Sequence, residues 1–225
     1  MQGPPRDDRD VCFRRGEPES CSYDLAVADP DSLLGEVLFR VEAHLVGALG
    51  PDTGRAGVSF VGADPIDVLR FGPDATGLVR YATVGMSRTP MTDSAADVVA
   101  VDGPRAELVL SVRGGRDTAL RRLAVLAAAP VVEGIVVTSG AGLDLGEPLW
   151  DGGRFTAVLV GAPGGLVPDL PIGNGFAPVQ FLPLLPMTRN EAAWKRVHGA
   201  QALEERWLAA GTDLRDPDRP EVDLS

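Results

Sequence analysis

Residues 179–191 read Val-Gln-Phe-Leu-Pro-Leu-Leu-Pro-Met-Thr-Arg-Asn-Glu, an apolar run that leads directly into a helix start. The run predicts a buried strand over 179–185, and Pro183 within it is typical of an edge strand or a bulge. Thr188 and Glu191 have the spacing of a capping box, in which the hydroxyl caps the N3 amide and the glutamate reaches back. A strand joined directly to a helix is therefore expected here.

In the rest of the chain, glycine and proline residues separate short apolar segments from one another. The expected strands are 57–61, 66–71, 78–85, 107–112, 131–138, 155–161 and 179–185. The expected helices are 32–49, 117–128, 189–198 and 200–210. Pro130 is expected to end the second of these helices. Because strands outnumber helices and come in runs, we predict an α+β fold with a mixed, mostly antiparallel sheet flanked by helices.

The overall charge limits the kinds of partner. The chain has 225 residues, 21 Lys and Arg against 32 Asp and Glu, and a net charge of −11. Duplex DNA and anionic membranes both require a cationic face on the protein, so neither nucleic acid nor a membrane is expected as a partner. A basic protein remains compatible with this charge.

The acidity is concentrated near the two ends. Residues 1–31 contain four Arg and eight acids, and residues 211–225 contain two Arg and five acids. We therefore predict a flexible, Pro-rich segment over 1–31, a folded domain over 32–210 and a solvated acidic tail over 211–225. Cys12 and Cys21 lie in the first segment, and the sequence leaves their pairing open. No secretory signal or apolar stretch of membrane-spanning length is visible, so a cytoplasmic location is expected.

A dinucleotide-binding loop and a metal site can both be considered, but the sequence lacks residues that each requires. The segment 135–146 runs from a strand-like stretch into Gly140-x-Gly142, but Leu145 stands where a dinucleotide-binding loop needs its third glycine. The following Gly-Glu-Pro cannot open a helix, so the pyrophosphate would find no helix N-terminus. The two histidines and two cysteines lack metal-ligand spacing. No cofactor and no metal are expected.

A serine hydrolase is a weaker alternative. Residues 85–89 read Gly-Met-Ser-Arg-Thr, one residue short of a nucleophile elbow because Thr89 replaces the last glycine. A nucleophile at Ser87 or Ser139 would also need a histidine base. Only two histidines exist, both in expected helices, so we predict a protein that is not an enzyme.

Three blocks of the chain resemble the suppressor of fused domain. The segment 176–204 shows that family's strand with a Phe-Leu pair, its Thr-x-x-Glu helix start and a Gly before a final Leu-rich helix. The segment 79–91 resembles its aromatic strand that ends in Gly-x-Ser, and 106–112 resembles its Glu-Leu strand. The resemblance covers about residues 32–210.

The resemblance implies a non-enzymatic α+β domain that binds another protein. Animal relatives use a second domain to clamp a peptide of a transcription factor, and this chain has no room for that domain. Bacterial relatives are proposed as immunity proteins against polymorphic toxins. A basic toxin domain would suit the net charge, because opposite charges steer association. The oligomeric state is left open.

Binding residues favour loops beside rigid strands, which points to 86–93 and to the loop 139–150. The predicted partner-binding residues are Met86, Ser87, Arg88, Met91, Asp144 and Trp150. Two interpretations of Trp150 stay open: an exposed hot-spot residue, or an anchor that packs the loop, which is slightly favoured. A small-ligand module that uses the glycine-rich loop is the remaining alternative function.

Overall fold

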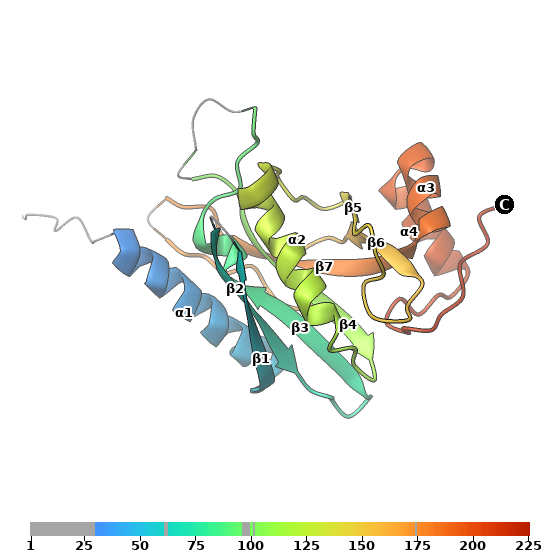
Figure 1. The fold of residues 1–225 in the computed structure, drawn as a ribbon, viewed down its shortest axis with the longest axis horizontal. Helices are drawn as coiled ribbons and strands as arrows, with labels where there is room; N and C mark the ends of the chain where they lie inside the picture. Colours follow the sequence, from blue (N-terminus) through green and yellow to red (C-terminus); the bar gives the residue numbers. More distant parts are fainter. Residues whose placement is uncertain (1–29, 61–62, 96–99, 101, 174) are drawn as a thin grey trace, which may run out of the picture.

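The computed structural model describes residues 30–60, 63–95, 100, 102–173 and 175–225, and it contains a seven-stranded sheet (Figure 1). The strands are β1 (Asp52–Phe60), β2 (Ala63–Phe71), β3 (Leu78–Val84), β4 (Arg105–Arg113), β5 (Gly142–Asp144), β6 (Phe155–Val160) and β7 (Val179–Thr188). The helices are α1 (Pro30–Leu49), the 3-10 turn η1 (Met86–Arg88), α2 (Ala119–Glu133), α3 (Arg189–His198) and α4 (Ala200–Ala209).

The sheet is mixed and mostly antiparallel, as predicted. Its strand order is β1-β2-β3-β4-β7-β6-β5, and the pairing of β4 with β7 is parallel. The first four strands form a meander in which each strand pairs antiparallel with the next along the chain, and the connection from β3 to β4 is the longest because it contains η1. After β4 the chain crosses through α2, builds β5 and β6 at the far edge, and returns through β7 to fill the gap beside β4.

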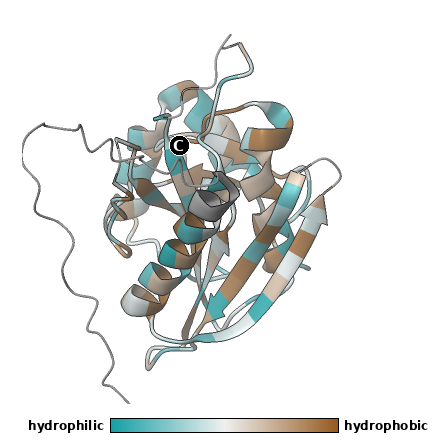
Figure 2. Ribbon diagram, turned by 90° about the vertical axis from the view of Figure 1, so that its left-hand side faces the viewer, coloured by the Kyte–Doolittle hydropathy of each residue, from teal (hydrophilic) through white to brown (hydrophobic). Residues whose placement is uncertain are grey.

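Each face of the sheet packs against helices, because alternate strand residues are apolar on both sides. One face lies under α2, where Leu123 and Ala127 pack among Leu108 and Leu110 of β4. The other face is covered in two parts. Helix α1 packs on β2, β3 and β4 near one end, and α3 with α4 packs on β6 and β7 near the other. Figure 2 shows brown, hydrophobic segments recurring along the strands.

The helix start predicted at Thr188 is confirmed. The Thr188 hydroxyl accepts a hydrogen bond from the Glu191 amide at 3.2 Å, and the Glu191 carboxylate accepts one from the Thr188 amide at 2.8 Å. Helix α3 therefore begins directly where β7 ends. Because the cap fixes this junction, it also fixes how α3 lies on the sheet.

The prediction around Pro130 is wrong. Helix α2 continues through Pro130 to Glu133, and no strand forms over 135–138. Proline removes one amide donor, but Ala127, Ala128, Ala129 and Pro130 are all buried, so the packing of these last turns outweighs the lost hydrogen bond. The helix ends instead at Gly134, whose φ of 66° is left-handed and whose amide donates to the Pro130 carbonyl at 3.1 Å.

The expectation of a solvated C-terminal tail is also wrong. Residues 211–225 return to the α3–α4 side, where Arg219 is 2% exposed and Val222 is buried. The cause is a buried acceptor: Glu191 binds the Arg219 guanidinium, which a composition argument could not detect. Most of the predicted segment 1–31, with both cysteines, lies outside the described residues. No described helix combines the length and apolar character needed to cross a membrane.

Candidate functional site

The turn that follows β3 is built around one buried carboxylate, that of Glu107 on β4. One oxygen of this carboxylate accepts hydrogen bonds from the amides of Gly85 (2.9 Å) and Ser87 (3.0 Å) and from the Ser87 hydroxyl (2.7 Å). The other oxygen accepts from the Thr83 hydroxyl at 2.6 Å. Glu107 and Ser87 are both fully buried. The carboxylate therefore fixes the path of the chain through η1.

Gly85 is required at this turn. Its φ is 136°, a conformation that residues with a Cβ rarely adopt. A Cβ at this position would lie 3.1 Å from the Pro65 carbonyl oxygen and 3.1 Å from Cδ1 of Ile66. The Gly-x-Ser pattern thus has a structural reason: the glycine makes the turn, and the serine binds the buried carboxylate.

Among the residues that the structure describes, no cation forms an ion pair with this carboxylate. Burial raises the pKa of Glu107, and the four hydrogen bonds oppose this effect without cancelling it. Arg105, two residues earlier on β4, donates instead to the carbonyls of Ser87 (2.8 Å) and Arg88 (2.7 Å). Burial lowers the pKa of Arg105. The turn is consequently held by two side chains that bind the turn rather than one another: Glu107 accepts from amides and hydroxyls, and Arg105 donates to carbonyls.

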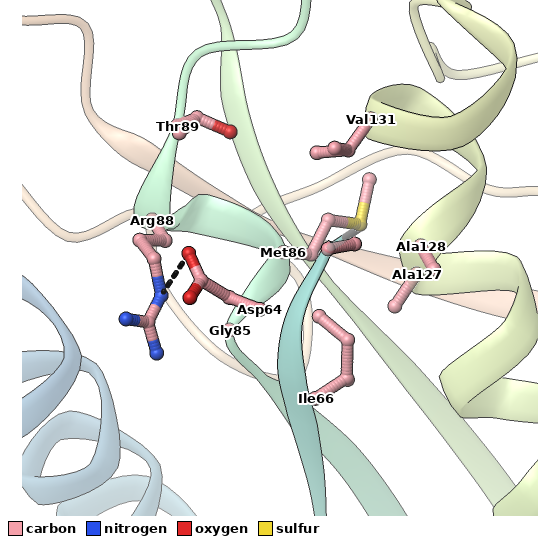
Figure 3. Close-up of a pocket in the computed structure, with 10 residues that line it drawn as sticks. Asp64, Ile66, Gly85, Met86, Arg88, Thr89, Ala127, Ala128 and Val131 are labelled. Atoms are coloured by element: carbon pink, nitrogen blue, oxygen red, sulfur yellow. Dashed lines mark ion pairs between the residues drawn. The ribbon is translucent and has the colours of Figure 1, made fainter. Parts of the chain in front are cut away.

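A hollow of about 380 Å³ lies beside this turn (Figure 3). Three elements line it: the start of β2, the turn at η1 and the last turns of α2. Its lining residues are Ala63, Asp64, Ile66, Gly85, Met86, Arg88, Thr89, Ala127, Ala128 and Val131. The floor is apolar because Ile66, Met86 and both alanines are buried core residues. At the rim, Val131 is 55% exposed.

One side of the hollow is charged. Nε of Arg88 lies 3.6 Å from Oδ2 of Asp64, which is an ion pair too long for a hydrogen bond (Figure 3). That buried Nε has no hydrogen-bond acceptor among the described residues. An apolar floor beside an incompletely satisfied charge is suited to an amphipathic side chain or a short peptide segment.

The structure separates the six predicted site residues. Met86 and Arg88 line the hollow, whereas Ser87 and Met91 lie beneath the surface in the same part of the molecule. Asp144 is exposed on the edge strand β5, and β4, β7 and β6 lie between β5 and β3. The predicted residues therefore do not form one continuous surface.

Trp150 is packed as a loop anchor. It is 3% exposed and meets the Phe155 ring edge to face, with 5.4 Å between ring centroids. The part of the hollow that sequence reasoning missed comes from β2 and from the end of α2. The available signal was Val131 and Val132, two consecutive valines after Pro130, which are exposed on a helix rather than paired in a strand.

Neither serine of the hydrolase alternative faces a histidine base. Ser87 donates its hydroxyl hydrogen to Glu107, and Ser139 lies in an exposed turn. His44 contacts the Pro168 carbonyl through Nε2 at 2.7 Å, and His198 stacks on Trp194. Within the described ranges, no group of three or more potential ligands could hold a metal ion.

Comparison with known proteins settles the family. The family model described as Suppressor of fused protein (SUFU) matches residues 62–220, more than half of the chain. The chain belongs to the suppressor of fused family. The matched range includes β2 from Ala63, the Glu107 turn, the hollow and the capping box of α3. No curated protein matches this chain.

Solved structures of this family share the fold. A suppressor of fused homologue from Neisseria gonorrhoeae aligns with a TM-score of 0.64 and 18% identity, over 85% of this chain and 99% of that one. A crystal structure of the Sufu–Fu complex aligns with a TM-score of 0.58 and 11% identity, over 84% of this chain and 91% of that one. Drosophila Suppressor of Fused aligns at 0.55 and 11%, over 83% of this chain and 50% of its own.

Proposed function

We propose that this chain is a non-enzymatic domain that binds another protein, and that the partner occupies the hollow beside η1. The observation that carries the proposal is an accessible apolar floor with a charged side, held open by a turn whose backbone is fixed by Glu107 and Arg105. A rigid rim costs little conformational entropy on binding. The Sufu–Fu complex supports the general class of function, because a family member is seen there with a protein partner.

The rim supplies the kind of contacts that a partner would use. Val131 offers exposed apolar area directly beside the hollow, and Asp64 is also exposed at its edge. A partner side chain that fills the floor would be surrounded by this rim, the arrangement in which truncation of one residue weakens binding most.

We further propose that the partner is a basic protein, and that neutralisation of a basic toxin domain is the most concrete role. The net charge of −11 supports this proposal, because a strongly acidic protein attracts a basic one and rejects other acidic proteins. Association should then become slower as salt increases.

The experiment is affinity capture from the source cells with mass spectrometry, followed by binding measurements on three purified forms: the wild type, Val131→Glu and Val125→Glu. Both valines are exposed on α2, but only Val131 lines the hollow. We expect Val131→Glu to weaken binding of the captured partner about tenfold or more, because the bound partner would desolvate the new charge at the rim.

The control variant should bind like the wild type. Equal affinity of all three forms would show that the partner binds elsewhere. Capture of a stoichiometric acidic or uncharged partner would refute the basic-partner proposal while leaving the site intact. Protection of cells from the captured protein when both are co-expressed would establish immunity.

A further inference from the structure

The hollow at η1 has one carboxylate at its edge, and that carboxylate is the more accessible of the two charged groups in its lining. The Asp64 side chain is 62% exposed, whereas the Arg88 side chain is 27% exposed and its Nε is buried. Figure 3 shows Asp64 between the Arg88 guanidinium and the apolar floor. A partner side chain that enters the hollow would therefore meet the carboxylate before the guanidinium.

The ion pair with Arg88 leaves Asp64 able to bind a second cation. The contact of 3.6 Å between Oδ2 of Asp64 and Nε of Arg88 is too long for a hydrogen bond, and no described residue donates one to this carboxylate. An ionised carboxylate has about four acceptor sites, so most of its capacity is open to a donor from another molecule. The ammonium of lysine and the guanidinium of arginine are the donors that a carboxylate binds most strongly.

Helix α2 adds to the negative character of this site. Its last turns line the hollow with Ala127, Ala128 and Val131, and its C-terminal end is the negative pole of the helix dipole. The last turn contains no basic residue, and its charged residue is Glu133. Because cations stabilise a helix C-terminus and acids destabilise it, a cation from a partner would supply what this end of α2 lacks.

The apolar floor is suited to the stem of a basic side chain. Its residues are each at most 4% exposed and carry apolar side chains: Ile66, Met86, Ala127 and Ala128. Lysine and arginine bury their methylene stems along such a surface while the charged end stays at a polar rim. Figure 3 shows Val131 across the floor from Asp64, so Val131 would contact the stem rather than the charged end. A glutamate at that position would be desolvated by the stem, which agrees with the weaker binding expected of Val131→Glu.

We propose that the hollow at η1 binds a lysine or arginine side chain of the partner protein, with the methylene stem on the floor and the cationic group at Asp64. The inference rests on the function proposed above, and it names the type of residue that the partner inserts. Asp64 is then the residue that makes the site select a basic side chain over an apolar or an acidic one.

The first test measures the chemistry of the hollow without the partner. The full chain, labelled with ¹³C at the methionine methyl groups, is titrated with n-butylammonium, butan-1-ol and pentanoate, which share a butyl chain and differ in charge. The Met86 methyl reports on the floor, and the Met187 methyl, which packs with α3 and α4, is the internal control. We expect butylammonium to bind about fivefold more tightly than butan-1-ol, and pentanoate to bind most weakly.

Asp64→Asn and Asp67→Asn are the matched variants. Both acids lie on β2, and each is in a long ion pair with one arginine: Asp64 with Arg88 at 3.6 Å, and Asp67 with Arg55 at 3.5 Å. Of the two acids, only Asp64 lines the hollow. Asp64→Asn should remove the preference for butylammonium over butan-1-ol, and Asp67→Asn should keep it. Equal affinity of the three probes, tighter binding of pentanoate, no shift of the Met86 signal with butylammonium, or an unchanged preference in Asp64→Asn would each overturn the proposal.

Binding of the captured partner separates this inference from the proposed function. Weaker binding by Val131→Glu and by Asp64→Asn, the latter about fivefold, supports both. If Val131→Glu weakens binding and Asp64→Asn does not, the hollow is the binding site but a basic side chain is not its ligand. If neither variant weakens binding, the partner binds elsewhere and both proposals are wrong.

Discussion

Two glutamates are buried in the described part of the chain, and they are stabilised in opposite ways. Glu107, under the turn after β3, accepts four hydrogen bonds from uncharged donors. Glu191, at the start of α3, binds the Arg219 guanidinium through both oxygens at 2.8 Å and also accepts from the Trp207 indole at 3.2 Å. The first carboxylate organises one turn, whereas the second fastens the C-terminal segment to the domain.

The difference shows in the pKa values. Burial dominates at Glu107 and raises its pKa. At Glu191 burial also acts to raise the pKa, but the hydrogen bonds and charge of Arg219 outweigh it, so the pKa is lowered. Burial beside a cation therefore shifts the acid toward its charged form, and burial without a cation shifts it toward its neutral form. This comparison yields four predictions.

The largest effect is expected for Arg219→Ala. The substitution leaves the Glu191 carboxylate buried without its cation and removes contacts with the Phe155 and Trp207 rings. We expect a loss of about 3–5 kcal/mol in the free energy of unfolding, measured by urea denaturation. The matched control, Arg215→Ala, breaks a pair that is half exposed and should cost at most about 1 kcal/mol. Similar losses in the two variants would show that burial does not make the loss of the Arg219–Glu191 pair more costly.

Gly85→Ala should come next. The left-handed backbone and the close Pro65 carbonyl should cost about 2–3 kcal/mol in unfolding free energy. Gly146 also has a positive φ, of 69°, but open space surrounds it, so Gly146→Ala should cost only about 1 kcal/mol. If both variants are equally stable, the turn after β3 tolerates a side chain and our account of it fails.

The pH dependence should separate the two glutamates. Because Glu107 has a raised pKa when folded, it binds its proton more tightly in the folded state than in the unfolded state. Its contribution is therefore most favourable below the unfolded value of 4.5 and decreases as the pH rises through the folded pKa. Relative to the wild type, Glu107→Gln should gain stability over this rise, by about 1.4 kcal/mol per unit of pKa shift.

Glu191 should behave in the reverse sense. Its folded pKa is lowered, so its contribution is present above 4.5 and is lost as the pH falls through the folded value. Urea denaturation of the wild type, Glu107→Gln and Glu191→Gln across this pH range measures both effects. If the free energy of unfolding depends on pH in the same way for all three proteins, the directions assigned to the two pKa shifts are wrong.

The smallest effect is expected for Ser87→Ala. The change removes one hydroxyl donor, but the Ser87 amide, the Gly85 amide and Thr83 continue to bind Glu107. We expect a loss of about 1 kcal/mol, as for one ordinary hydrogen bond. A loss as large as that for Arg219→Ala would mean that the serine, rather than the whole set of donors, holds the carboxylate.

The sequence predicted those features that depend on local spacing. The capping box at Thr188 and Glu191 and the expected strands other than 131–138 follow from short-range patterns, and the structure contains them. The second role of Glu191 could not be predicted, because Arg219 is 28 residues away and acquires meaning only when the chain folds back. A buried ion pair between residues far apart in the chain leaves no pattern in the sequence around either residue.

The candidate site was predicted only in part for the same reason. The Gly-x-Ser segment identified Met86 and Arg88, but the residues opposite them come from β2 and from α2. Helix α2 was predicted too short because Pro130 was taken as the end of the helix, although the buried packing of the last turns carries the helix past it. That error removed Val131 from the helix and hid the rim of the hollow.

Hydrogen exchange of the full chain, with and without its captured protein partner, tests the central claim most directly. We expect slower amide exchange on binding at 85–89 and 127–133, two segments that border the hollow at η1. The amides around α4, at 203–214, should exchange at unchanged rates. Protection confined to α4 or to other surfaces, with 85–89 unaffected, would contradict the placement of the binding site.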